Sequence, residues 1–232
     1  AGILEKENTM RFLRFVQSFR YTPLTLEQKL KKVATAKCWG GWTLYSRDQQ
    51  IQRLRYVVER VYEDARSRKE ELFSLKGVEP ERARAIVQEI EIIASEIERG
   101  GKTEQATVES FDEILTSSPK SILGRALELF FYRVGYFNMT RLLLARTWED
   151  IGFIDQTLYD GGLAKLYEAF NREIRQVLRH GLGLAGDHYR WLFNVDNNYT
   201  WYEPSDETLI EVLYELSNFY LGNLNQDILG TI

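Results

Sequence analysis

The chain has 232 residues, which is enough for one well-packed domain or for one domain with an appendage. Hydrophobic residues make up 44% of the sequence and charged residues 28%, a composition typical of globular rather than disordered proteins. One Cys excludes a disulfide framework and a Cys-rich metal site, and two His argue against a His-rich one. The net charge of −4 argues against nucleic-acid binding, so we expect no nucleic-acid partner. From the few Cys and His residues we expect no metal, and we also expect no cofactor.

Neither a secretion signal nor a membrane span is predicted. The first residues lack the apolar core of a signal peptide. The most apolar stretch, residues 122–145, contains Arg125, Glu128, Arg133 and Arg141, whereas a spanning helix needs about 20 residues with few charges. We therefore expect a protein that is not secreted and that resides in a reducing compartment, the cytoplasm or the interior of an organelle, with any membrane contact at its periphery.

Helical periodicity runs through almost the whole chain, so the predicted fold class is all-α. We expect a single domain, residues 1–232, built as a multi-helix bundle of about eight helices. Its parts are basic N-terminal helices in residues 1–45, a projecting helical hairpin in residues 46–99, and a compact helical body in residues 103–232 with an aromatic loop near residues 187–204.

The basic N-terminal part is predicted to hold two helices. Phe12, Phe15 and Phe19 recur at helical spacing in residues 4–20, and Arg14 lies beside them. After a break at Pro23, Thr25 and Gln28 form the pattern of a capping box, which predicts the start of a second, Lys-rich helix.

The hairpin is predicted from two matching apolar seams. Ser46 and Gln49 resemble a second capping box, and from residue 51 apolar side chains step by three and four up to Leu75, interrupted by Arg68. Gly77 and Pro80 then suit a helix end and a new start. The seam resumes in residues 83–97, so we expect two antiparallel arms.

In the body, Ser118 is predicted as the N-cap of a helix that runs to about residue 146. This helix is apolar on most sides and is expected at the centre of the fold. Further helical segments are predicted over residues 148–159 and 163–180. The glycine-rich stretch 181–186 is predicted to be a flexible break, and Ser205 to cap a last helix.

The two ends of the chain carry opposite charge. Residues 1–37 contain eight basic and three acidic side chains, whereas residues 191–232 contain seven acidic side chains and no basic one. Two interpretations stay open: the ends attract each other, or they provide separate faces for partners of opposite charge.

No catalytic set is found, so we predict that the protein is not an enzyme. Cys38 has only His180 and His188 as potential bases, and nothing in the sequence brings either of them near it. The glycines of residues 181–186 have the spacing of a dinucleotide-binding fingerprint, but a helix precedes them where the fingerprint needs a strand.

The leading hypothesis is a non-enzymatic helical interaction protein: a subunit, adaptor or assembly factor of a larger complex, with protein partners or further copies of itself. The candidate partner-binding residues combine exposed-looking aromatic and charged positions. They are Phe12, Arg14, Phe15, Lys76, Glu79, Trp201 and Tyr202.

Two alternatives remain. The first is a small-molecule-binding or enzymatic domain with an aromatic pocket and one polar group. Its candidate residues are Tyr132, Arg133, Tyr136, Tyr159, His188 and Trp191. The second is a peripheral protein that lies on an anionic membrane surface through residues 4–37.

Overall fold

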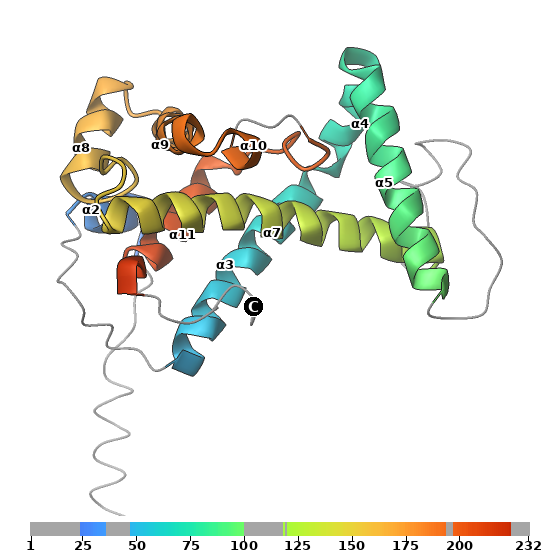
Figure 1. Cartoon of the computed structure of the whole chain (residues 1–232), viewed down its shortest axis with the longest axis horizontal. Helices are drawn as coiled ribbons and strands as arrows, with labels where there is room; N and C mark the ends of the chain where they lie inside the picture. The colour runs from blue at the N-terminus through green and yellow to red at the C-terminus, as the bar shows by residue number, and fades with distance from the viewer. Residues whose placement is uncertain (1–23, 36–46, 100–117, 119, 194–196, 224–232) are drawn as a thin grey trace, which may run out of the picture.

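A computed structural model describes residues 24–35, 47–99, 118, 120–193 and 197–223. Within these ranges all regular structure is helical, which confirms the predicted all-α class (Figure 1). The described helices are α2 (Leu26–Ala34), α3 (Arg47–Ser67), α4 (Lys69–Val78), α5 (Pro80–Arg99), α7 (Ile122–Asp150), α8 (Asp160–Ala169), α9 (Ile174–His188), α10 (Arg190–Phe193), α11 (Asp206–Leu216) and the 3₁₀ helix η1 (Leu221–Asn223).

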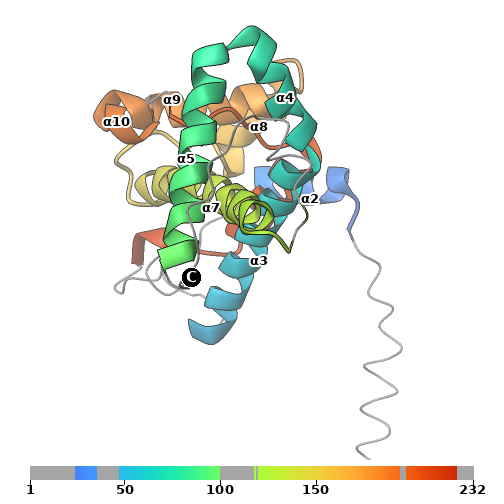
Figure 2. The ribbon, with the colours of Figure 1, turned by 90° about the vertical axis from the view of Figure 1, so that its right-hand side faces the viewer.

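Helix α7 forms the central axis of the fold, as its apolar sequence predicts. It has 29 residues, and α3, α5, α9 and η1 all pack on it. Figure 2, which looks nearly along α7, shows α3 and α5 on either side of it. The helix begins later than predicted, because the Oγ of Ser121 rather than that of Ser118 accepts the capping hydrogen bond, at 3.0 Å from Gly124 N.

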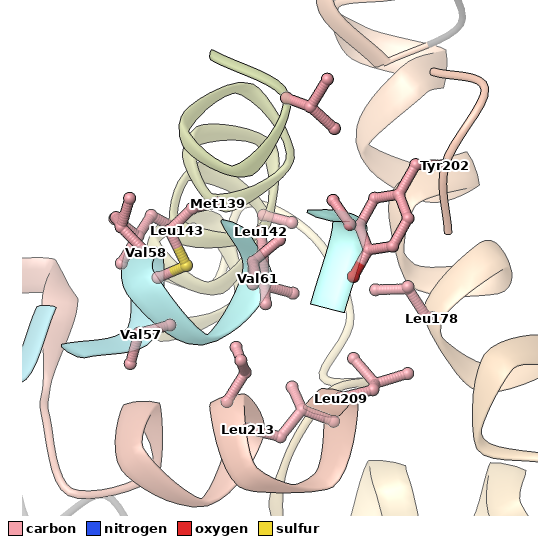
Figure 3. Close-up of a cluster of buried hydrophobic side chains, with 14 of the residues drawn as sticks. Val57, Val58, Val61, Met139, Leu142, Leu143, Leu178, Tyr202, Leu209 and Leu213 are labelled. Carbon is pink, nitrogen blue, oxygen red and sulfur yellow. The ribbon is translucent and has the colours of Figure 1, made fainter. Parts of the chain in front are cut away.

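The core lies where four helices meet. Figure 3 shows side chains from α3, α7, α9 and α11 pointing toward one another. The labelled residues of these helices are Val57, Val58, Val61, Met139, Leu142, Leu143, Leu178, Leu209 and Leu213, and Tyr202, from the segment before α11, is labelled beside them. All ten are buried, so the apolar seam predicted on the first hairpin arm does form a buried face, but that face packs on α7 and α11.

The hairpin differs in detail from its prediction. The helix expected over residues 46–76 is divided at Arg68, which separates α3 from α4. The backbone of Arg68 leaves the helical conformation, with φ −100° and ψ 21°, and its side chain pairs with the carboxylate of Glu71 and donates to the backbone carbonyl of Glu203. Helices α4 and α5 meet at the predicted turn around Pro80 and project beyond α7, whereas α3 and the rest of α5 lie against α7 (Figures 1 and 2).

Helices α2 and α11 bring opposite charges together. The predicted capping box of α2 is confirmed: Thr25 and Gln28 exchange hydrogen bonds between side chain and backbone. Lys29 then pairs with Glu211 of α11 at 3.0 Å, and Arg60 of α3 reaches the same carboxylate at 2.8 Å. Within the described residues, a basic side chain of the N-terminal part and an acidic side chain of the C-terminal part therefore form an ion pair inside the protein.

Two helices predicted in the body differ from the structure. The chain leaves the helix after Asp150, so residues 151–159 are irregular rather than helical. The helix expected over residues 163–180 is divided, because α8 ends in a turn where Asn171 and Arg172 have positive φ.

Residues 181–186 are not a flexible break but part of α9. A Cβ on Gly181 would lie 2.5 Å from Thr157 Oγ1 and 3.0 Å from the Leu158 side chain. The missing side chain lets the irregular segment pack directly against the helix, which outweighs the weak helix propensity of glycine.

Ser205 caps α11 as predicted, with its Oγ accepting from Thr208 N. The predicted aromatic loop near residues 187–204 is partly helical, because α9 extends to His188 and α10 covers Arg190–Phe193. The helix predicted over residues 4–20 and the capping position Ser46 lie outside the described residues.

Candidate functional site

The chain reverses sharply at the end of α7. Gly152 has φ +72°, a conformation that glycine adopts without steric cost and that commonly ends a helix. The amide of Phe153 then donates to Trp148 O at 2.8 Å, and that of Ile151 donates to Thr147 O at 3.0 Å. This reversal leaves the side chains of Ile151 and Phe153 more than half exposed.

A buried charge network fixes the segment that follows. One carboxylate oxygen of Glu149 accepts from Thr157 N (2.9 Å), Thr157 Oγ1 (2.5 Å) and Leu158 N (3.0 Å). Arg146 donates to Glu149 at 3.2 Å and to Asp150 at 3.1 Å, and all three side chains are almost fully buried. Burial raises the pKa of Glu149, while Arg146 and the three hydrogen bonds oppose that shift.

Four exposed rings and one exposed aliphatic side chain gather beside this segment and form what we call the aromatic patch: Phe153, His188, Tyr189, Trp191 and Ile151. Trp191 is 72% exposed and Phe153 is 53% exposed. The rings of Phe153 and His188 are 4.6 Å apart between centres, and those of Tyr189 and Trp191 are 5.5 Å apart. The patch therefore spans the end of α7, the end of α9 and α10.

Trp148 lies between the aromatic patch and the hydrophobic core. Its half-buried ring contacts Phe153 at 5.3 Å and Phe193 at 5.6 Å between centres, and it also contacts His188. The rings of Phe153 and His188 thus rest on a ring that itself packs against the core. Such a surface is held in place before any partner arrives.

Part of the predicted partner surface cannot be compared with the structure. Phe12, Arg14 and Phe15 lie outside the described residues. Lys76 belongs to α4, but its side chain is also outside the described set.

The other predicted partner residues occupy different environments. Glu79 is exposed at the α4–α5 turn and pairs with Arg82 at 3.0 Å. Trp201 is half-buried against the core. Tyr202 is only 3% exposed and its hydroxyl donates to Asp64 at 2.5 Å, so it is a core residue and not, as expected, part of an exposed surface.

The six residues of the predicted aromatic pocket do not converge. Tyr132, Arg133 and Tyr136 lie in the first half of α7, and Arg133 pairs with two carboxylates of α5. Tyr159 is buried against Arg146, which is about 21 Å farther along α7 than Tyr132 at a rise of 1.5 Å per residue.

His188 and Trp191 belong instead to the aromatic patch. The prediction grouped these six residues by ring chemistry, and the helices that carry them separate the rings. The sequence analysis missed Ile151 and Phe153, since it placed both in a helix. The available signal was Gly152, a glycine between two large apolar residues after a long apolar helix.

The described residues show neither a metal-binding cluster nor a membrane-spanning helix. Among the described residues, no three His, Cys, Asp or Glu side chains are arranged to hold a metal ion. Over the same residues, no helix combines the length and the apolar character that crossing a bilayer requires. No family model matches the chain, and no curated protein or solved structure is significantly similar to it.

Proposed function

We propose that the protein is a non-enzymatic helical interaction protein, a subunit, adaptor or assembly factor of a complex, and that the aromatic patch binds another protein chain. The observation that carries this proposal is the proximity of two exposed ring pairs: Phe153 packs on His188, and Tyr189, the next residue in the chain, packs on Trp191. Contiguous exposed apolar surface on a globular protein commonly marks an interaction site.

The residue types also suit a protein interface. Trp and Tyr bury a large apolar area while keeping a polar group for hydrogen bonding, and they are enriched among residues that dominate binding energy. Asp155, Asp187 and Arg190 are exposed in the same stretches of chain and supply a charged rim. An apolar centre with a polar rim is the usual anatomy of an interface.

Rigidity further supports the proposal. The buried network of Arg146 and Glu149 fixes the segment that carries Phe153, so little conformational entropy is lost when a partner binds. The proposed partner is a different protein with an apolar groove that accepts the rings. The compartment, and the membrane-surface role of residues 4–37, remain predictions.

Site-specific photocrosslinking in the cells that produce the protein tests the proposal. A benzophenone amino acid replaces Trp191 in one variant and Ile92 in another, since Ile92 is an exposed apolar residue of α5 away from the patch. We expect a discrete crosslinked product from position 191 and none from position 92. Equal crosslinking from both positions would contradict the proposal, and a product containing two copies of this chain would replace it with a homo-oligomer.

A further inference from the structure

A cleft of about 560 Å³ opens beside α9 and α10, and no residue of the aromatic patch lines it. Helices α5, α7, α9 and α10 and the segment 200–204 form its walls. Its apolar lining consists of Leu178, Leu182, Phe193, Trp201 and Pro204. The volume lies within the usual range of small-molecule sites.

Arg141 is a largely buried cation in the wall of this cleft. Its guanidinium donates to the carbonyl oxygen of Phe193 at 2.5 Å and lies 5.7 Å from the centre of the Phe137 ring. Among the described residues no carboxylate pairs with it, and its Nε is buried without an acceptor. Burial lowers the pKa of Arg141, but a guanidinium stays protonated at neutral pH, so its charge has no carboxylate counterpart within the described part of the chain.

The other two arginines of the cleft already have carboxylate partners. Arg179 forms a bidentate pair with Glu203, at 2.7 and 2.5 Å. Arg82 pairs with Glu79 at 3.0 Å and donates to Thr200 at 2.8 Å. Of these three arginines, Arg141 is therefore the one that has no carboxylate partner among the residues that the structure describes.

Trp201 adds a second unsatisfied donor. Its indole Nε1 is buried and has no acceptor within the described part of the chain, although most buried polar groups in native proteins are hydrogen-bonded. Two residues that line the cleft, Arg141 and Trp201, thus each carry a buried N–H donor without an acceptor among the described residues. These two donors favour a ligand that brings oxygen acceptors.

We propose that this cleft binds a small organic carboxylate with an apolar body, whose anionic end pairs with Arg141 and whose body packs against Leu182 and Trp201. A guanidinium matches the planar fork of a carboxylate. The single positive charge of Arg141 fits a monoanion better than a phosphate ester, which carries about 1.5 to 2 negative charges at neutral pH. This inference goes beyond the proposed interaction function and uses residues outside the aromatic patch.

Titration of the intact chain tests the inference. The probes are 4-phenylbutyrate, indole-3-acetate and octanoate, each compared with its neutral amide, with phenyl phosphate as the dianion. Binding is followed by calorimetry and by the indole N–H signal of Trp201, assigned with Trp201→Phe. We expect at least one carboxylate to saturate with a Kd of about 1 mM or lower, to shift that signal, and to bind about tenfold more tightly than its amide and than phenyl phosphate.

Variants on α7 identify the recognising charge. Arg141→Gln should weaken carboxylate binding by about tenfold or more and leave amide binding unchanged, whereas Arg141→Lys should retain part of the affinity. The control is Arg125→Gln, an exposed position on the same helix, which should bind like the parent chain. The inference is overturned if no carboxylate saturates by about 5 mM, if amide or phosphate binds as tightly, or if Arg141→Gln binds like the control. Should Arg141→Gln not fold, the comparison of acid with amide on the parent chain still decides.

Discussion

The guanidinium carbon of Arg146 lies 3.5 Å from the centre of the Tyr159 ring, and both side chains are almost completely buried. Arg146 also pairs with Glu149 and Asp150, whose carboxylates organise the chain beyond α7. A cation–π contact and two buried ion pairs thus meet at one side chain. The irregular segment that carries Phe153 depends on this arrangement for its shape.

Replacing Arg146 should therefore destabilise the whole fold. Arg146→Met leaves Glu149 and Asp150 buried without their cation, and such losses cost about 3–5 kcal/mol. Arg172→Met is the control, because its pair with Glu168 is exposed and should contribute less than about 1 kcal/mol. Urea denaturation gives both free energies of unfolding, and similar losses in the two variants would contradict the buried network.

Two glycines of α9 should respond in opposite directions. Gly181→Ala would place a Cβ 2.5 Å from Thr157 Oγ1, and we expect a loss of about 1–3 kcal/mol from overpacking. Gly183→Ala meets nothing within 4 Å, so the better helix propensity of Ala should stabilise the protein by about 0.5–1 kcal/mol. Thermal unfolding of both variants checks the signs, and a gain from Gly181→Ala would show that residues 157–158 do not pack against α9.

The start of α7 gives a third test. Ser121 Oγ accepts from Gly124 N, so Ser121→Ala should cost about 0.5–2 kcal/mol. Ser118→Ala should change the free energy of unfolding by less than about 0.5 kcal/mol, because Ser118 is exposed and does not cap the helix. If the larger loss came from Ser118→Ala, the helix would begin where the sequence alone predicts.

Alkaline pH should weaken the contact between α5 and the segment before Pro204. The Tyr199 hydroxyl donates to Glu89 at 2.5 Å, and burial, followed by this hydrogen bond, raises the pKa of Tyr199 to about 12. The folded-state pKa lies above the unfolded value of about 10, so the stabilisation is complete below pH 10 and is lost as pH rises toward 12.

Tyr199→Phe removes this titration. Its stability should therefore fall less steeply than that of the parent chain between about pH 10 and 12, although Tyr62, whose pKa is also raised to about 12, still contributes. Denaturation midpoints over this pH range provide the measurement. Identical slopes for the two chains would contradict the assigned role of Tyr199.

Local patterns predicted the parts of the fold that depend on nearby residues. Thr25 with Gln28 and Ser205 with Thr208 cap helices as expected, because each cap is made within three residues. The apolar seam of α3 is buried as predicted, because the spacing of apolar residues along a helix determines which face is apolar. Its partner was not predictable, since a stripe indicates which face is buried but not what covers it.

The failures arise where distant contacts override local preference. Glycine weakens an isolated helix, but Gly181 is retained in α9 because residues 157–158 approach it. Likewise, Tyr202 looked like an interface aromatic until its hydrogen bond to Asp64, 138 residues away, placed it in the core. That Arg141 has no carboxylate partner among the described residues has no sequence signal at all, since pairing depends on the three-dimensional arrangement of the carboxylates.

The most direct test of the interaction function is a quantitative affinity purification from the native cells. Three tagged chains are compared: the parent, the double variant Phe153→Ala/Trp191→Ala, and Ile92→Ala, whose exposed fraction of 53% matches that of Phe153. Circular dichroism first establishes that all three are equally folded. We predict a stoichiometric protein partner with the parent and with Ile92→Ala, and its loss by about tenfold or more from the double variant. Equal recovery of the same partner by all three chains would contradict the role of the aromatic patch.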